Sequence, residues 1–456
     1  MLRLLDFLRI DDLPPRCRPN YLVELRHMAL WGIFAGLVDG NTSSIVVAKT
    51  FGGSSLLVTI VWTSPLLAHL LSLIWSVLSR GRPRVAMYRW LALGAVASVL
   101  SVALTPSHAG PWAAWLFALQ ITSARIFVSG IVNVRSSIWQ ANYPQTHRAR
   151  AAGKLQTLGF IALLITSATI GSLFDRNADY YVYIYPIIAV IGGISLLPLR
   201  RLRIRGERAT HARARANAET ARAGDKSLVA GLAEAWSILR NDKPFARYCS
   251  AQYLLGSASF MVEPVFTVFV TKGLKLSYLF TSVLLDHVPV ILQLSTIRLW
   301  ARYFDRVGVL RFRVVNGALW TTSAALACLG LMAHSAFAPT ALVIALLALS
   351  RAAKGVGVGG GAIAWNLGHL QFAPPHQAEL YMGIHVALTG LRGIIMPFVG
   401  MGCYTLLGWP SLGLATAVAA SAALLFRRLA NELPAYPQPV AAPALDTATA
   451  ESEGID

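Results

Sequence analysis

Long apolar runs divide this 456-residue chain, and most polar positions fall between them. A helix needs about 20 apolar residues to cross the hydrocarbon core of a bilayer. The runs are continuous, whereas barrel strands alternate, so the pattern predicts an all-α integral membrane protein with twelve transmembrane helices. The expected spans are 28–49, 54–78, 85–105, 112–139, 155–174, 180–199, 246–271, 278–298, 313–334, 338–366, 380–407 and 410–427.

The segment before the first run, residues 1–27, is interrupted by acidic residues and prolines such as Asp6, Asp11 and Pro14. A secretory signal peptide has an uninterrupted apolar core followed by a cleavage site. We therefore expect residues 1–27 to form a cytoplasmic N-terminal segment, and the first apolar run to act as the membrane signal.

The composition supports a membrane protein, because 55% of the residues are hydrophobic and only 13% are charged. A soluble domain carries about 25% charged residues. The four cysteines are far apart and show no spacing typical of a metal site. No HExxH or GxSxG motif is present. We therefore expect no metal, no cofactor and no enzymatic activity.

Positive charge is distributed unevenly between the two ends of the predicted spans. With the N-terminus on the cytoplasmic side, 31 of the 40 Lys and Arg residues lie on that side, four lie on the opposite side and five lie within spans. Cytoplasmic loops of membrane proteins are enriched in these residues. The asymmetry predicts a multi-pass protein of the cell membrane, or inner membrane, with both termini in the cytoplasm. It also accounts for the net charge of +19 without nucleic-acid binding, since basic loops anchor on anionic lipid.

The longest polar segment, residues 200–245, is a basic cytoplasmic linker between two sets of six spans. Its second part places Leu228, Leu232, Trp236 and Leu239 on one helical face. The linker separates an N-terminal six-helix bundle at 28–199 from a C-terminal six-helix bundle at 246–430. The tail at 431–456 is expected to be cytoplasmic and disordered.

The two bundles share a pattern of ionisable residues. Asp39 in the first span and Arg125 in the fourth correspond to Glu263 and Arg351 in the first and fourth spans of the second bundle. A proline is followed nine residues later by a glycine in the loop after each fourth span, at 144–153 and 374–383. The pattern indicates that the two bundles are structural repeats.

Twelve spans, a division into six and six, and a long basic central loop resemble the major facilitator superfamily. The sequence ARYFDRVGVLRFR from residue 301 is similar to the superfamily's loop signature Gly-x-x-x-Asp-Arg-x-Gly-Arg-Arg, through Asp305, Arg306, Gly308 and Arg311. Ala301 replaces the leading glycine, and the corresponding loop of the first bundle has Ser79 where the aspartate would stand. The resemblance implies that residues 305–311 form a gating loop and that the bundles alternate access to a central site.

Ionisable residues within the spans are the candidate site, because they are costly in lipid and usually face a cavity or a partner. The superfamily's first, fourth, seventh and tenth helices line its central cavity. The resemblance therefore implies that Asp39, Arg125, Glu263, Arg351 and Lys354 face it, and we add Arg392 as a substrate-binding candidate. The alternative is internal pairing of Asp39 with Arg125 and of Glu263 with Arg351. The candidates for proton coupling are Asp39, Glu263, Asp286 and His287, although Asp286 and His287 are nearer the outer face, which favours a structural role.

Bases outnumber acids within the spans, which favours an anionic or zwitterionic organic solute, since arginine binds carboxylate and phosphate groups in a bidentate manner. The sequence thus predicts a monomeric secondary active transporter of a small molecule, with protons as a candidate coupling ion. The alternative is a non-transporting membrane sensor or scaffold on a transporter-like fold. Ionisable residues in the middle of the membrane favour transport.

Overall fold

The computed structural model describes residues 10–11, 13–71, 74–75, 78, 82–106, 110–204, 228–374 and 378–433. Within these ranges the regular structure is helical and includes no strand, which confirms the predicted all-α fold. The expectation of a disordered tail falls on residues 434–456, which lie outside the described residues together with positions 205–227 of the linker.

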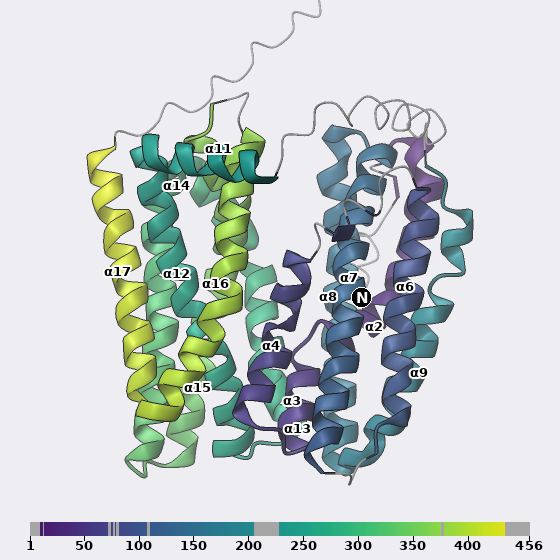
Figure 1. Cartoon of the computed structure of the whole chain (residues 1–456), viewed down its shortest axis with the longest axis horizontal. Coiled ribbons are helices and arrows are strands. Elements are labelled where there is room, and N and C mark those ends of the chain that lie inside the picture. Colours follow the sequence, from purple (N-terminus) through teal and green to yellow (C-terminus); the bar gives the residue numbers. More distant parts are fainter. Residues whose placement is uncertain are drawn as a thin grey trace, which may run out of the picture.

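The chain before the linker forms one group of helices, on the right of Figure 1. Short 3-10 turns flank several of them: η1 (Pro15–Cys17), η2 (Ser101–Leu104), η3 (Ala178–Tyr180) and η4 (Pro198–Arg201). The helices are α2 (Arg18–Val38), α3 (Thr42–Lys49), α4 (Ser55–Leu70), α6 (Arg84–Leu100), α7 (Pro111–Asn142), α8 (Gln145–Arg176) and α9 (Tyr181–Ile194).

The chain after the linker forms a second group beside the first, and α3, α4 and α13 lie between the two (Figure 1). Two π-helical turns, η5 (Phe269–Gly273) and η6 (Val283–His287), flank α13, and a 3-10 turn, η7 (Gly368–Gln371), follows α15. The helices are α11 (Leu228–Asn241), α12 (Lys243–Val268), α13 (Tyr278–Ser282), α14 (Val288–Ser335), α15 (Thr340–Leu367), α16 (Ala378–Leu407) and α17 (Pro410–Glu432).

Ten helical segments of the described chain are long and apolar enough to cross a membrane. One of them, Tyr278–Ser335, has 58 residues, far more than the roughly 20 that a single crossing needs. It bends at Gly308, where φ is 72° and ψ is 170°, a conformation essentially restricted to glycine. A further apolar helix, Ser55–Ala68, is shorter. The chain is therefore a multi-pass membrane protein.

The first predicted span differs from the structure in its start and its continuity. The helix begins at Arg18 rather than at residue 28, and it is interrupted between Val38 and Thr42. The residues at the break are Asp39, Gly40 and Asn41, and all three types are poor helix formers. The interruption leaves the last carbonyl groups of α2 in the interior without helical partners.

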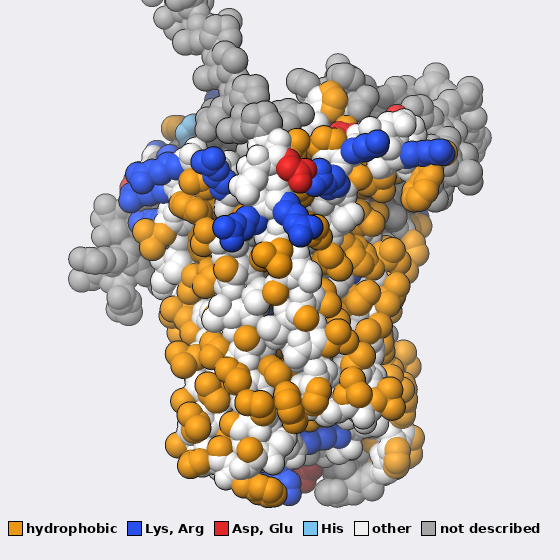
Figure 2. Space-filling model, turned by 90° about the vertical axis from the view of Figure 1, so that its left-hand side faces the viewer, with side chains coloured by type: hydrophobic (Ala, Val, Ile, Leu, Met, Phe, Trp, Pro, Cys, Tyr) orange, Lys and Arg blue, Asp and Glu red, His pale blue; other side chains and the backbone are white. Residues whose placement is uncertain are grey.

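Figure 2 shows apolar side chains over most of one face of the second group, with Lys and Arg gathered at one end. Exposed bases at that end include Arg302 and Arg306 in α14 and Arg427 and Arg428 in α17. The predicted amphipathic helix of the linker is α11, which lies across the same end (Figure 1). The surface thus combines an apolar belt with one basic edge, as a bilayer and its anionic headgroups require.

Candidate functional site

Arg125 lies in α7 and is buried against the break between α2 and α3. Its Nε donates to the carbonyl oxygen of Val38 at 2.8 Å, and its Nη2 donates to that of Gly40 at 3.3 Å. These are carbonyls that the interrupted helix cannot satisfy by itself. A cation is also favoured at the C-terminus of a helix by the helix dipole. Arg125 therefore acts as the C-terminal cap of α2.

The same guanidinium also donates hydrogen bonds to a second helix, α4. Its Nη1 donates to the carbonyl oxygen of Val61 and to Ser64 Oγ, the latter at 2.7 Å. Pro65 lies four residues after Val61 and has no N–H to offer its carbonyl. Arg125 thus replaces the hydrogen bond that the proline removes.

Asp39 ends α2, and its side chain is exposed although it belongs to a predicted span. The structure brings it close enough to Arg125 for its charge to act on the guanidinium. The acid and the arginine of the first bundle are therefore neighbours, while four acceptors other than Asp39 also hold the arginine in place.

Glu263, Arg351 and Lys354 form a compact ionic cluster between α12 and α15. Arg351 Nη1 lies 3.0 Å from Glu263 Oε1, and Lys354 Nζ lies 2.7 Å from Glu263 Oε2. The guanidinium of Arg351 also lies 3.7 Å from the ring centroid of Phe266. Each carboxylate oxygen of Glu263 thus has its own cation. The predicted pairing of Glu263 with Arg351 is present, and Lys354 shares the carboxylate.

The space beside this cluster is small. A cavity of about 10 Å³ borders Glu263, Trp320 and Ser323, which is about the volume that one water needs. In this conformation the cluster joins two helices, and the cavity that borders Glu263 is too small for an organic solute.

Asp286 and His287 lie in the π-helical turn η6 and contact the first group of helices. Asp286 Oδ1 accepts hydrogen bonds from Asn41 Nδ2 at 2.7 Å and from the Asn41 backbone N–H at 3.4 Å. The charge of Lys354 also acts on Asp286. Asp286 therefore interacts electrostatically with the Glu263 cluster and is hydrogen-bonded to the break in the first span.

The His287 ring is held on both sides by main-chain carbonyls. Its Nδ1 lies 3.1 Å from the carbonyl oxygen of Ser282, and its Nε2 lies 2.9 Å from that of Leu164 in α8. A neutral imidazole has only one N–H, whereas the imidazolium donates from both nitrogens. Only the protonated ring can therefore complete both hydrogen bonds.

Further hydrogen bonds join the two groups at the end where α3 and α13 lie (Figure 1). Asp175, at the end of α8, accepts from the backbone N–H groups of Tyr278 at 2.5 Å and of Leu279 at 3.0 Å. A carboxylate is well suited to the first turn of a helix, where the N–H groups lack partners. Tyr278 also contacts Thr50, with 2.9 Å between their hydroxyl oxygens. Two ammonium groups add contacts to carbonyl oxygens, Lys49 to Leu276 and Lys272 to Gly53.

The predicted gating loop is largely helical and bends at Gly308. The side chains of Asp305, Arg306 and Arg311 are exposed. After the bend, the backbone N–H of Val309 donates to Gln371 Oε1 at 3.3 Å. The bend therefore ties the start of the second part of α14 to η7, the turn that follows α15.

Arg392 in α16 lines a pocket of about 340 Å³ between α12, α14, α15 and α16. It donates to the carbonyl oxygen of Gln252, and its Nη2 lies 3.4 Å from Thr389 Oγ1. Arg392 is the one predicted substrate-binding residue that lines this pocket. The remaining pocket residues come from four helices and are mainly apolar or aromatic.

Arg313 also lines this pocket and is almost completely buried. In the predicted topology it is one of the cytoplasmic loop bases, because it stands at the boundary of the ninth span. The bend at Gly308 redirects α14 so that Arg313 points into the bundle. The sequence feature that could have indicated a buried Arg313 is Asn316, a polar residue about one helical turn later. In the structure, Nη1 of Arg313 lies 3.3 Å from Asn316 Oδ1.

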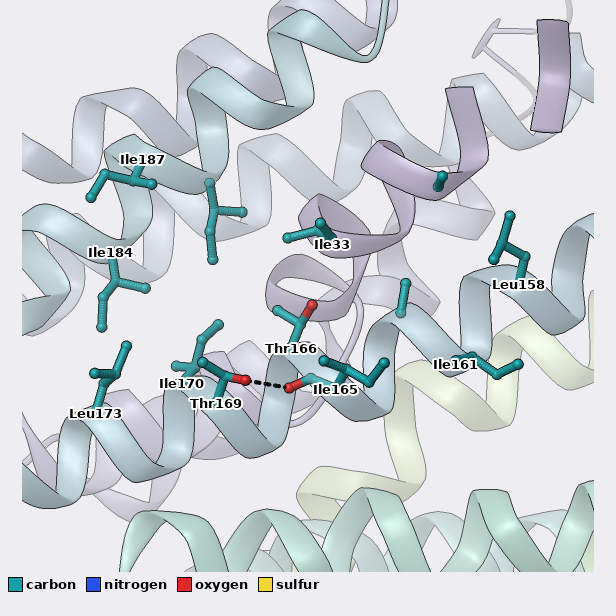
Figure 3. A pocket seen from close by; sticks show the side chains of 13 residues that line it. Ile33, Leu158, Ile161, Ile165, Thr166, Thr169, Ile170, Leu173, Ile184 and Ile187 are labelled. Carbon is teal, nitrogen blue, oxygen red and sulfur yellow. Dashed lines mark hydrogen bonds between the residues drawn. The ribbon is translucent and has the colours of Figure 1, made fainter. Parts of the chain in front are cut away.

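A larger groove of about 510 Å³ lies between α2, α8 and α9 and is lined almost entirely by isoleucine, leucine and alanine (Figure 3). Ile165 and Ile187 in its lining are more than half exposed. Thr166 and Thr169 are its polar side chains, and Thr169 Oγ1 donates to the carbonyl oxygen of Ile165 in its own helix. The groove is therefore an apolar outer surface suited to lipid, and the smaller pocket is the candidate solute site.

No family model matches the chain, and no curated protein matches it. Several solved transporter structures do. A mutant of the nucleoside transporter NupG is 15% identical with a TM-score of 0.68, over 91% of this chain and 99% of that chain. A D-xylose–proton symporter is 14% identical with a TM-score of 0.64, over 92% of this chain and 98% of the symporter. An auto-inhibited peptide transporter of the POT family is 13% identical with a TM-score of 0.64, over 93% of this chain and 99% of that chain. The likeness covers the whole membrane domain, and the chain therefore has the fold of the major facilitator superfamily of transporters.

Proposed function

We propose that the protein is a secondary active transporter that moves a small organic solute across the cell membrane by alternating access. The fold is that of transporters and points to transport rather than catalysis. In this proposal the 58-residue segment Tyr278–Ser335 counts as two spans that meet at Gly308, which raises the ten apolar segments to eleven. The shorter helix Ser55–Ala68 is the twelfth span. The moving bodies are the bundles at 28–199 and 246–430.

The observation that carries this proposal is the position of the hydrogen bonds between the two groups of helices. They use α3, α8, η5, α13 and η6, and α3 and α13 lie at the end of the molecule opposite α11 (Figure 1). The exposed bases of α14 and α17 lie at the other end, near α11. We take the basic end as cytoplasmic, so the described conformation is closed on the outer side.

Close contact between α8 and α13 depends on Gly171. A Cβ atom at this position would lie 2.8 Å from Leu279 Cα and 3.0 Å from its backbone nitrogen. These are backbone atoms, which cannot move aside as a flexible side chain can. Any larger residue must therefore push α13 away from α8 and open the outer contact.

We expect Gly171→Leu to expose the outer path. A cysteine introduced at Thr50, which contacts Tyr278 across the interface, should react about fivefold faster or more with a membrane-impermeant maleimide applied from outside, because the population shifts to the open state. Gly153→Leu is the matched control in the same helix, since a Cβ there meets no atom within 4 Å. Equal labelling in the Gly171 and Gly153 variants would contradict alternating access at this interface.

Proton coupling through His287 is part of the proposal. The protonated ring can donate to both Ser282 and Leu164, and the neutral ring to only one of them. The carboxylate of Asp286 lies next to it and contacts Asn41. Loss of the proton therefore removes a hydrogen bond either within η6 or across the outer interface.

His287→Leu removes both ring donors, including the one that faces the carbonyl oxygen of Leu164 in α8. It should therefore increase labelling of the Thr50 cysteine from outside, as Gly171→Leu does. Labelling in His287→Leu equal to that in the parent protein would exclude this residue as a contact that keeps the outer side closed, and would leave Asp286 to be tested in the same way with Asp286→Asn.

A further inference from the structure

The pocket between α12, α14, α15 and α16 contains two buried guanidinium groups and borders no acid. Arg313 is 1% exposed and Arg392 is 4% exposed. Among the described residues that line the pocket, none is Asp or Glu. The nearby Asp242, at the start of α12, is engaged by Tyr381 at 2.8 Å and by the backbone N–H of Phe245 at 3.0 Å. Two buried cations thus line one small pocket with no carboxylate among its described lining residues.

Several N–H groups of these arginines lack acceptors. Arg313 Nε and Nη2 and Arg392 Nε have no hydrogen-bond partner. The hydroxyl of Tyr248 lies close to Arg313, and it is oriented toward the carbonyl oxygen of Ala364 at 3.5 Å. Buried donors are nearly always satisfied in folded proteins, and an unpaired buried charge is costly. The N–H groups on these three nitrogens therefore indicate an acceptor that is anionic and comes from outside the chain.

The position of Arg392 is set by a glycine. A Cβ atom at Gly256 would lie 2.1 Å from Arg392 Cζ, so the guanidinium rests directly on the backbone of α12. From there it lies 5.6 Å from the ring centroid of Phe260. This arrangement holds the cation at the pocket wall instead of letting it extend toward the headgroups.

The rest of the lining suits a flat apolar body. Phe260, Trp320 and Trp365 contribute aromatic rings, and Trp365 Nε1 donates to Thr389 Oγ1 at 3.3 Å. The ring of Phe260 also lies 6.2 Å from that of Trp62 in α4, in the other group of helices. An occupant of the pocket would therefore adjoin the contact between the two groups.

We propose that this pocket binds an organic anion, with its carboxylate or phosphate group between Arg313 and Arg392 and its flat apolar part against Phe260, Trp320 and Trp365. The assignment rests on the proposed transport function, for which it names the substrate class. Both carboxylate and phosphate match the planar donor fork of arginine. Of the bases predicted from the sequence to bind substrate, Arg392 lines this pocket, whereas Arg351 and Lys354 pair with Glu263.

The test is the thermal stabilisation of the full-length, detergent-solubilised protein by three probes, benzoate, phenyl phosphate and neutral benzamide, at about 10 mM and equal ionic strength. We expect benzoate or phenyl phosphate to raise the Tm and benzamide to leave it unchanged. The better of the two anions identifies the headgroup. Arg392→Gln and Arg313→Gln should weaken its apparent affinity about tenfold or more, since each removes a charged donor. Arg392→Lys should restore it only in part, because lysine lacks the fork.

Arg427→Gln is the control for general loss of positive charge, since this arginine is exposed on α17 and should leave the affinity unchanged. If the pocket arginine variants fail to fold, Asn366→Asp provides an independent test. This isosteric change adds a negative charge at an exposed pocket residue and should weaken anion binding. Stabilisation by benzamide equal to that by the anions, equal affinity in all variants, or no stabilisation by either anion would overturn the assignment. The labelling of the Gly171 variant needs no ligand, so it tests transport separately.

Discussion

Glu263→Gln is expected to be the most destabilising single substitution in the ionic cluster, at about 3–5 kcal/mol, because it leaves buried cations without their counterion. Arg351 and Lys354 both depend on this carboxylate, at 3.0 and 2.7 Å. Arg351→Gln should be milder, since Glu263 then keeps Lys354 as its partner. The measurement is thermal unfolding of the purified variants, together with the fraction that elutes as a single species.

Glu432→Gln is the matched control for this prediction. Glu432 forms an ion pair with Arg247 at 2.6 Å, and both side chains are 50% exposed. Exposed pairs contribute little to stability because solvent screens them, so the same chemical change at a similar distance should have little effect. If Glu263→Gln were no more destabilising than Glu432→Gln, the buried cluster would not be a structural element of the fold.

The second large effect is expected at Arg125. Arg125→Met should destabilise the protein by about 3 kcal/mol or more, because each buried acceptor left unsatisfied costs about 1–3 kcal/mol. The carbonyls of Val38 and Gly40 would lose their side-chain donor, and that of Val61 would keep only Ser64 Oγ at 2.9 Å. Thermal unfolding of the solubilised variant measures this loss directly.

Asp39→Asn separates the two interpretations of Arg125. Asp39 is exposed at the end of α2, so its neutralisation should cost about 1 kcal/mol or less, as for other exposed charges. Thermal unfolding of both variants shows whether Arg125 acts mainly as a helix cap or mainly as the ion-pair partner of Asp39. A loss in Asp39→Asn as large as that in Arg125→Met would show that the ion pair, and not the helix cap, is the main role of the arginine.

The membrane character of the chain could be predicted from its sequence because the bilayer restricts the possible structures so strongly. Spanning segments must be long, apolar and helical, since backbone groups have no water to bond. The run at 338–366 is accordingly α15, and that at 410–427 lies within α17. The Glu263–Arg351 pair could also be anticipated as one of two alternatives, because ionisable residues within spans usually face a partner or a cavity.

Tertiary structure alone decided which groups surround each ionisable residue. Arg125 donates to carbonyl oxygens that lack helical partners, at the break after α2 and, because of Pro65, in α4. These two irregular sites lie in different helices and meet only when the bundle packs. From the sequence alone Arg313 belongs to a basic loop, whereas in the structure it follows the bend at Gly308 and lines the pocket with Arg392. The sequence determined where the apolar helices and the charges lie along the chain, because hydropathy and charge are local properties. Packing determined which charges are neutralised and which are left facing a pocket, because that depends on backbone breaks and contacts between distant segments.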